Sequence, residues 1–342
     1  MSLALPKRLK QSLQVALSLA LAGWIFWLLY KDLDFSLITA ALSEMHRGWF
    51  IASILLSIYG FWLRAYRWKL LLNTDTDTEA ISTLNSFWAL MIGYVTNLLL
   101  PRAGEVARCA AVNRLSGKPI SQSLGTVVVE RSLDLLFLLA TIGIAFLVEA
   151  KLFLRLFGEL VDLGALAQSF QNNLPFLLGA LAITGIAIRI LVKKYAASGW
   201  VNKFQQFARQ VLTGIQSIGK LDKPFAFWAS SVLIWLSYYL TMYWVALAIP
   251  STANLSASAI LLVMVMGSIG MVAPVQGGIG TFHALVAYIL NVLGLELTEG
   301  KVFAVIIHGS QTLLVALVGL LAFGASLKIL NAQATKKRGE SF

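Results

Sequence analysis

Long apolar stretches constrain the fold of this chain more than any other feature. A helix needs about 20 mostly apolar residues to cross the ~30 Å hydrocarbon core of a bilayer. Only 13% of the 342 residues are charged, whereas soluble domains carry about 25%. The sequence therefore predicts an all-α polytopic membrane protein and argues against a soluble helical domain. The expected full spans, about six, cover residues 12–30, 49–69, 121–148, 174–192, 225–249 and 301–328.

The positive charges follow the loops between these spans. Membrane proteins carry an excess of Lys and Arg in their cytoplasmic loops. With both termini inside, 20 of the 27 Lys and Arg residues fall inside, 5 outside and 2 within spans. We therefore expect a multi-pass protein of the cytoplasmic (inner) membrane with its N-terminus and C-terminus inside. This topology accounts for the net charge of +11, so no nucleic acid is expected as a partner.

Signals for metals, cofactors and catalysis are missing from the sequence. The single cysteine cannot form an internal disulfide, and the three histidines lack metal-ligand spacing. No phosphate-binding Gly-Lys loop, nucleophile elbow or HExxH motif occurs. We expect no metal, no cofactor and no catalytic residue set, which favours a transporter over an enzyme.

Two pairs of short segments differ from the full spans. Residues 84–100 and 104–115 flank Pro101-x-x-Gly104, and residues 257–273 and 281–294 flank Pro274-x-x-Gly277. Each pair is predicted to be a re-entrant helical hairpin. The charge-derived topology makes the hairpins enter from opposite sides, which predicts an inverted-topology repeat with a site between its halves. The expected hinge residues are Gly93, Pro101, Gly104, Pro274, Gly277, Gly278 and Gly280.

The repeat sets the expected domain organisation. Residues 1–342 form one integral membrane domain with halves at about 1–150 and 174–328, and residues 193–224 form a basic cytoplasmic loop. Apolar residues along one helical face of the loop fit either a helix on an anionic leaflet or a cytoplasmic helical hairpin. Polar residues deep in spans, such as Tyr238 and Gln311, are expected to face the bundle interior.

Ionisable residues at membrane depth mark the candidate site, because placing them in lipid is costly. The uncharged part of the third span, Leu135–Val148, has 14 residues, or about 21 Å at 1.5 Å per residue. Glu130, Arg131 and Asp134 are therefore expected within the membrane. Glu130 and Asp134 share a helix face, so they need cations nearby or one of them will take up a proton. The candidate cations are Arg64, Arg67, Arg102 and Arg108.

Two interpretations of these charges stay open. Arg64 and Arg67 lie on one helix face and fit either phosphate contacts or an ordinary belt of snorkelling residues. Glu130 and Asp134 fit either a substrate site or an ion-pair lattice that holds helices together, and both can be true of the same residues.

Three motifs carry a resemblance to a known family. NLLLPRAGEVARC, VVVERSLDLL and PVQGGIGTFH resemble the flippase-like integral membrane family, which includes the transmembrane region of lysylphosphatidylglycerol synthases. The resemblance covers nearly the whole chain and implies two re-entrant helix pairs and a role in moving lipid across the bilayer. The family's motif positions fall on Asn97, Pro101, Arg102, Gly104, Glu105, Glu130, Arg131, Asp134, Pro274, Gly277, Gly278 and Gly280.

Two positions depart from the family's pattern. His283 stands where many relatives have Glu, and His308 stands where many have Arg in the last span. A histidine pair fits either a charge that changes with pH or two neutral hydrogen-bonding side chains. No synthase domain follows within the 342 residues, so we do not expect this chain alone to aminoacylate lipid.

The leading hypothesis is a lipid flippase or translocase for an anionic or zwitterionic phospholipid or a polyprenyl-phosphate-linked lipid. The alternatives are a membrane-embedded lipid-modifying enzyme and a small-solute or ion transporter. The expected partners are membrane lipids, with a second copy of the chain and a separate lipid-modifying enzyme left open. The predicted headgroup-binding residues are Arg64, Arg67, Asn97, Arg102, Glu105, Arg108, Glu130, Arg131, Asp134, Gln276, His283 and His308.

Overall fold

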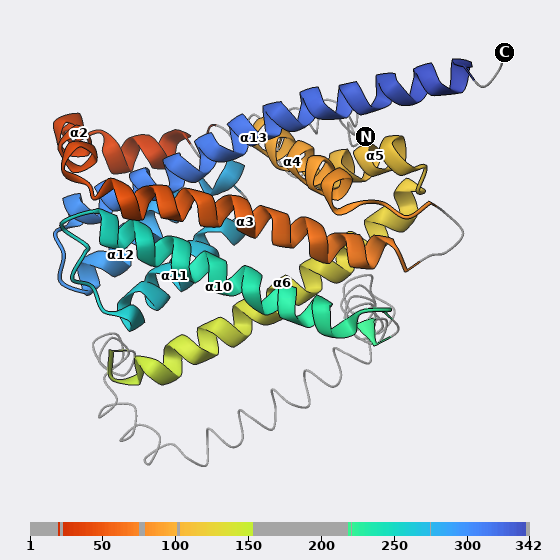
Figure 1. The fold of residues 1–342 in the computed structure, drawn as a ribbon. Helices are drawn as coiled ribbons and strands as arrows, with labels where there is room; N and C mark the ends of the chain where they lie inside the picture. Colours follow the sequence, from red (N-terminus) through yellow and green to blue (C-terminus); the bar gives the residue numbers. More distant parts are fainter. Residues whose placement is uncertain are drawn as a thin grey trace, which may run out of the picture. The chain divides into compact units, whose positions relative to one another are not determined.

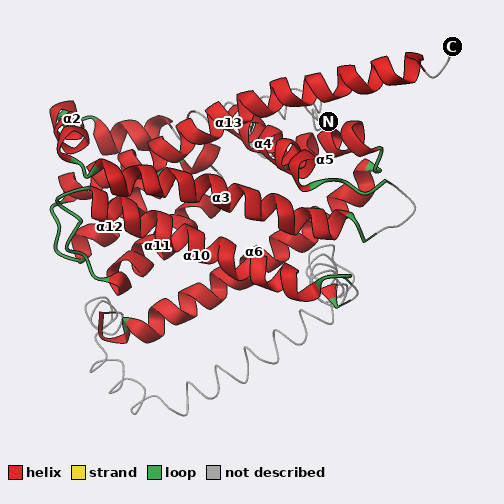
Figure 2. Cartoon of the chain, in the orientation of Figure 1, coloured by secondary structure: helices red, strands yellow, loops and turns green. Residues whose placement is uncertain are grey.

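All regular structure in the described part of the chain is helical (Figures 1 and 2). The computed structural model describes residues 20, 23–74, 79–100, 103–152, 218–219, 221–273 and 275–339. The helices are α2 (Phe35–Glu44), α3 (Arg47–Leu72), α4 (Thr83–Leu99), α5 (Gly104–Ser116), α6 (Ile120–Val148), α10 (Pro224–Ala248), α11 (Ala257–Val272), η1 (Gln276–Gly278), α12 (Thr281–Val292) and α13 (Leu297–Gly339).

Four of these helices are long and apolar enough to cross a membrane: α3, α6, α10 and residues Leu297–Ile329 of α13. They coincide with four of the predicted spans. Large apolar side chains on these helices point outward, among them Leu55, Leu236 and Leu320, as expected for helices in contact with lipid. The predicted span 174–192 and nearly all of the loop 193–224 lie outside the described residues, as does most of the span 12–30.

By internal contacts the chain divides into two compact units, one of Met1–Leu138 with Ile218–Phe342 and one of Leu139–Ser217. Only residues 139–152 of the second unit are described. The helix contacts and the candidate site lie in the first unit. The prediction of a single membrane domain with two repeat halves stays a prediction.

Helices α3 and α10 pack along each other at small residues (Figure 1). A Cβ at Gly60 on α3 would lie 2.9 Å from the Ser237 hydroxyl on α10. One turn earlier on α3, Ser57 Oγ lies 3.5 Å from Thr241 Oγ1. Small residues let helix backbones approach closely in membranes, where lipid is as apolar as the core. This packing fixes the position of Arg64, one turn after Gly60.

Helices α4 and α5 form the first predicted short pair, and they pack against each other. A Cβ at Gly93 would lie 2.8 Å from the Gly104 carbonyl oxygen, so this contact needs glycine. Asn97 Oδ1 accepts a hydrogen bond from the Gly104 N–H at 2.7 Å, which satisfies an otherwise free donor at the start of α5. The observed bounds agree with the predicted segments 84–100 and 104–115 to within a residue. Pro101 and Arg102, between the helices, lie outside the described residues.

Helices α11 and α12 form the second pair, and they also pack against each other. A Cβ at Gly270 would lie 2.7 Å from Phe282 Cα. The turn between the helices has positive φ at Gly277 (57°), Gly278 (71°) and Gly280 (87°), a region that glycine enters without steric penalty. The three predicted hinge glycines are therefore required by the backbone. Pro274, the fourth predicted hinge in this motif, lies outside the described residues.

Helix α2 was not predicted from the sequence. Asp34 caps it by accepting a hydrogen bond from the Ser36 N–H at 2.8 Å. This hydrogen bond holds the pKa of the Asp34 carboxyl below its usual value. The helix has ten residues and buries none of them, so local capping rather than core packing defines its start.

Candidate functional site

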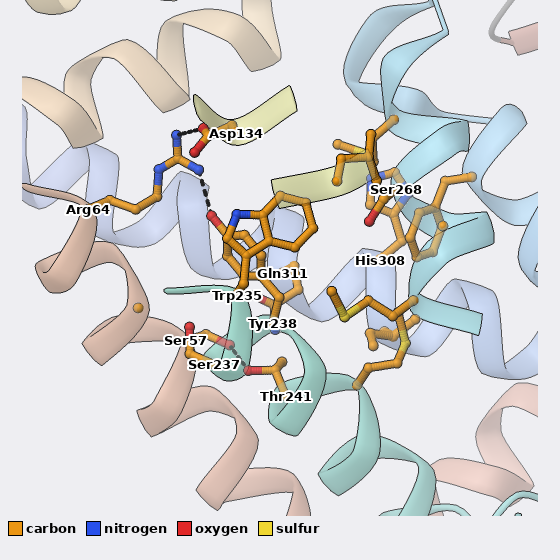
Figure 3. Close-up of a pocket in the computed structure, with 18 of the residues that line it drawn as sticks. Ser57, Arg64, Asp134, Trp235, Ser237, Tyr238, Thr241, Ser268, His308 and Gln311 are labelled. Carbon is orange, nitrogen blue, oxygen red and sulfur yellow. Dashed lines mark hydrogen bonds and ion pairs between the residues drawn. The ribbon is translucent and has the colours of Figure 1, made fainter. Parts of the chain in front are cut away.

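Five charged side chains from three helices form a buried ionic network. Arg64 Nη2 donates to Glu130 Oε1 at 2.6 Å and to Asp134 Oδ2 at 3.0 Å. Arg67 Nη2 donates to Asp134 Oδ1 at 2.7 Å and lies 3.6 Å from Glu130 Oε1. From α5, Arg108 Nη1 donates to Glu130 Oε2 at 2.9 Å. The network therefore ties α3, α5 and α6 together, and Figure 3 shows its Arg64–Asp134 contact.

The network is largely buried and carries an excess positive charge. The side chains of Arg67 and Glu130 are fully buried, and that of Arg108 is 3% exposed. Three guanidinium groups face two carboxylates, which leaves one positive charge without a partner inside the network. Buried ions need partners because the interior does not replace their hydration. Burial of Arg64 and Arg67 places them inside the bundle, which does not fit a snorkelling belt.

Several nitrogen atoms of this network lack an acceptor among the described residues. Arg108 Nη2 and the Nε atoms of Arg64 and Arg67 are buried without one. The Arg108 guanidinium also stacks on the Trp68 ring, with its Cζ 4.5 Å from the ring centroid. Spare donors next to excess positive charge suit an oxyanion, since guanidinium groups bind phosphate with directed hydrogen bonds.

A separate, more exposed ion pair lies beside the network. Arg131 Nη2 donates to Glu105 Oε1 at 2.8 Å, and the two side chains are 48% and 27% exposed. Glu105 Oε2 has no donor among the described residues. The sequence grouped Arg131 with Glu130 and Asp134, but the structure separates Arg131 from both carboxylates and pairs it with Glu105.

A cavity of about 520 Å³ opens next to the network. Arg64, Arg131 and Asp134 contribute charged groups to its lining, while most other lining side chains are apolar. Figure 3 shows the Arg64–Asp134 pair, Trp235, Tyr238 and Gln311, and the His308 and Ser268 side chains around this space. The remaining lining residues include Ser57, Phe61, Leu135, Leu138, Ser237, Thr241, Met242, Met264, Met271, Val272, Phe282 and Ile307.

Tyr238 links the network to the cavity wall. Its hydroxyl accepts a hydrogen bond from Arg64 Nη1 at 2.5 Å, and its ring lies 5.9 Å from the Trp235 ring, centroid to centroid. Tyr238 and Gln311 were expected to face the interior of the bundle, and both line the cavity. Trp235 was not predicted, because a tryptophan in an apolar helix gives no signal that separates a cavity from a lipid-facing surface.

His283 and His308 lie side by side, but apart from the arginines of the ionic network. The rings of His283 and His308 are 4.8 Å apart, centroid to centroid. His283 Nδ1 accepts from the Gly280 N–H at 3.3 Å, and its ring packs nearly perpendicular to the Phe26 and Tyr30 rings. His283 is buried, whereas His308 also lines the cavity. The aromatic surroundings and the backbone contact of His283 favour two hydrogen-bonding side chains over a charged pair.

Gln276 joins the two short helix pairs. Its side-chain amide Nε2 donates to the backbone oxygens of Asn97 at 2.7 Å and Leu98 at 2.8 Å. Both carbonyls lie at the C-terminal end of α4, where a helix leaves acceptors unsatisfied. The structure therefore places Gln276 and Asn97 at a junction between the pairs. Arg102, also predicted for the site, lies outside the described residues.

The fold and site together define a polytopic helical membrane protein with a buried, arginine-rich ionic network beside a largely apolar cavity. Groups of three or more His, Cys, Asp and Glu side chains that could hold a metal ion are absent from the residues searched, which are those described.

Residues 15–319 match the family model of the lysylphosphatidylglycerol synthase TM region, and the chain belongs to this family. The match confirms the resemblance carried by the three sequence motifs. It also shows that the chain is a multi-pass membrane protein of the flippase-like family. No curated protein matches the chain, and no solved structure matches it.

Proposed function

We propose that this protein is a lipid translocase that moves an anionic or zwitterionic phospholipid, or a polyprenyl-phosphate-linked lipid, across the cytoplasmic membrane. One observation carries the proposal: the wall of a largely apolar cavity contains Arg64 of the positively charged, buried network and Arg131 of the neighbouring ion pair. The cavity combines the two environments that an amphiphile needs, because arginine binds phosphate and apolar side chains accept the parts of the lipid nearest the tails.

The helix arrangement supports a path between two halves. Helices α4–α5 and α11–α12 are short pairs that touch through Gln276. We propose that each pair is a re-entrant hairpin, that the pairs belong to an inverted repeat with six full spans, and that both termini lie inside. In transporters of this kind, broken helices meet at the site near the bilayer midplane, where a headgroup would pass.

The other two functional classes fit the geometry less well. An enzyme using Glu130 and Asp134 as acid or base needs one of them free to exchange a proton, but arginines bind both carboxylates. A small-solute transporter would need a more polar cavity than this one, whose lining is mostly apolar.

The test uses purified protein in liposomes and a fluorescent phospholipid whose transfer exposes it to an added quencher. Arg131→Gln and Glu105→Gln break the half-exposed ion pair without emptying the buried network. We expect each variant to slow transfer at least about tenfold, equivalent to 1.4 kcal/mol of lost transition-state stabilisation. Both variants should keep a wild-type melting temperature.

Matched controls change the same residue types elsewhere. Arg47→Gln and Glu44→Gln alter exposed residues at the start of α3 and the end of α2 and should leave transfer unchanged. Transfer at the wild-type rate by both site variants, or no transfer by the wild-type protein above protein-free liposomes, would refute the proposed function.

A further inference from the structure

Two neutral hydrogen-bond donors in the cavity wall have no protein partner among the described residues. Trp235 Nε1 on α10 and Gln311 Nε2 on α13 are buried atoms without an acceptor, and both residues line the cavity. Figure 3 shows these side chains in the middle of the close-up, with the Arg64–Asp134 pair on one side and His308 and Ser268 on the other. Neither donor belongs to the ionic network.

Such donors are unusual enough to need an explanation. The large majority of buried side-chain polar atoms in proteins are hydrogen-bonded, and each one left unpaired destabilises the folded protein. Within the hydrocarbon region bulk water does not satisfy them. The indole N–H can only donate, so its partner must be an acceptor. Two unpaired polar groups in the wall of one cavity indicate a ligand with oxygen atoms at that place.

The contacts between Arg64, Tyr238 and Trp235 indicate how close that ligand's oxygen atoms lie to an anion bound at Arg64. Arg64 donates to the Tyr238 hydroxyl, and the Tyr238 ring lies 5.9 Å from that of Trp235. A ligand oxygen that accepts a hydrogen bond from Trp235 would therefore lie near an anion bound at Arg64, but not at the same position. In a diacyl phospholipid the ester carbonyls follow the phosphate by a few covalent bonds. In a polyprenyl-phosphate-linked lipid, the chain that follows the phosphate is a hydrocarbon without oxygen atoms.

We propose that Trp235 and Gln311 form a second subsite, which receives the acyl-ester carbonyl oxygens of a phospholipid whose phosphate lies at the arginines. This inference rests on the proposed lipid transport and narrows its substrate to the diacyl phospholipids among the lipids left open above. The two donors bind uncharged carbonyl oxygens and the arginines bind the phosphate, so the two subsites bind different parts of one molecule.

The experiment compares two phospholipids with the same labelled headgroup and chain length, one with ester-linked and one with ether-linked chains. Ether oxygens are weak acceptors, and the diether lipid lacks both carbonyls. The loss of two hydrogen bonds predicts that wild-type protein in liposomes transfers the diester lipid at least about tenfold faster. An excess of unlabelled polyprenyl phosphate should slow this transfer less than the same excess of unlabelled diester lipid.

Two variants assign the preference to the subsite. Trp235→Phe keeps an aromatic ring but removes the N–H, and Gln311→Leu keeps the approximate volume but removes the amide. Each should reduce the ester-to-ether ratio, and together they should bring it to about one. Trp228→Phe, which alters an exposed residue two turns earlier on α10, should keep the wild-type ratio.

The outcomes separate this inference from the proposed function. Equal transfer of both lipids by the wild-type protein overturns the subsite but leaves lipid transport standing. A wild-type ester preference in the double variant, or equal competition by polyprenyl phosphate, also overturns the subsite. Absence of transfer of either lipid overturns the transport function and the subsite together. Protection of the buried Cys109 thiol from a maleimide shows that each variant is folded.

Discussion

Replacing Glu130 with Gln should destabilise this protein more than any other single change in the ionic network. Glu130 is fully buried and lies within 3.6 Å of a nitrogen of each of three arginines, Arg64, Arg67 and Arg108. The substitution keeps the shape of the side chain but raises the excess charge of the network from one to two. Breaking a buried ion pair from one side costs about 3–5 kcal/mol, because the remaining charge stays buried without compensation.

Removing an arginine should cost less than removing this carboxylate. Arg108→Gln takes the network from one excess positive charge to none, and Glu130 keeps Arg64 and Arg67 as partners. The lost hydrogen bond to Glu130 contributes about 1.5–3 kcal/mol, and the lost stacking on Trp68 about 1 kcal/mol. Relief of charge repulsion offsets part of this loss, so we expect a net destabilisation of about 1–2 kcal/mol.

Cys109 provides the assay. It is the only cysteine of the chain, and it is completely buried among Trp68, Ala89 and Val112. A pulse of maleimide labels it only in molecules that have unfolded locally or globally. Labelled fractions measured across a series of SDS concentrations in mixed micelles give the free energy of unfolding for each variant. As a control, Lys31→Gln removes an exposed contact with Asp32 at 4.0 Å. This variant should leave the free energy of unfolding unchanged within the error of the measurement.

The charge count makes the prediction refutable. The double variant Glu130→Gln/Arg108→Gln restores the wild-type excess of one positive charge, so it should be more stable than Glu130→Gln alone. An equal or smaller loss in Glu130→Gln than in Arg108→Gln would contradict the reasoning. So would strictly additive losses in the double variant, since residues in one network should couple by about 0.5–3 kcal/mol.

Two further changes test the short helix pairs. Gly270→Ala should cost about 1–3 kcal/mol, because its Cβ would meet the Phe282 backbone at 2.7 Å, whereas Gly309→Ala meets nothing within 4 Å and should be neutral or slightly stabilising in the same SDS titration. Gln276→Leu removes two hydrogen bonds to the end of α4 and should cost about 1–3 kcal/mol. Hydrogen exchange at residues 96–100, followed by mass spectrometry, should become faster. Unchanged exchange would contradict the link between Gln276 and α4.

Much of the helical layout follows from the sequence because apolar length and glycine punctuation act locally. Four predicted spans appear as long helices, and the segment predicted at 84–100 is observed at Thr83–Leu99. Helix α2 escaped prediction because Asp34 caps a run of only ten residues, which is too short to stand out by hydropathy. Its cap geometry becomes evident only once the backbone is placed.

The contacts of the site were less predictable, because they depend on which helices are neighbours. Spacing put Glu130 and Asp134 on one face, and three of the four candidate cations, Arg64, Arg67 and Arg108, pair with them. The sequence did not show which arginine binds which carboxylate. Adjacent helical residues point about 100° apart, so Arg131 lies on a different face of α6 from Glu130. The structure shows this rotation, since Arg131 turns to Glu105.

The buried network and the outer Arg131–Glu105 ion pair differ in their capacity to bind a charged headgroup. Both carboxylates of the network already accept hydrogen bonds from arginines on each oxygen atom, so they have little capacity left for a cationic headgroup. Glu105 differs, because one of its oxygen atoms has no donor among the described residues. Under the proposed function, attraction for phosphate comes from the surplus arginine charge. Of the three carboxylates, Glu105, beside Arg131, is therefore the one with an acceptor atom still without a donor among the described residues.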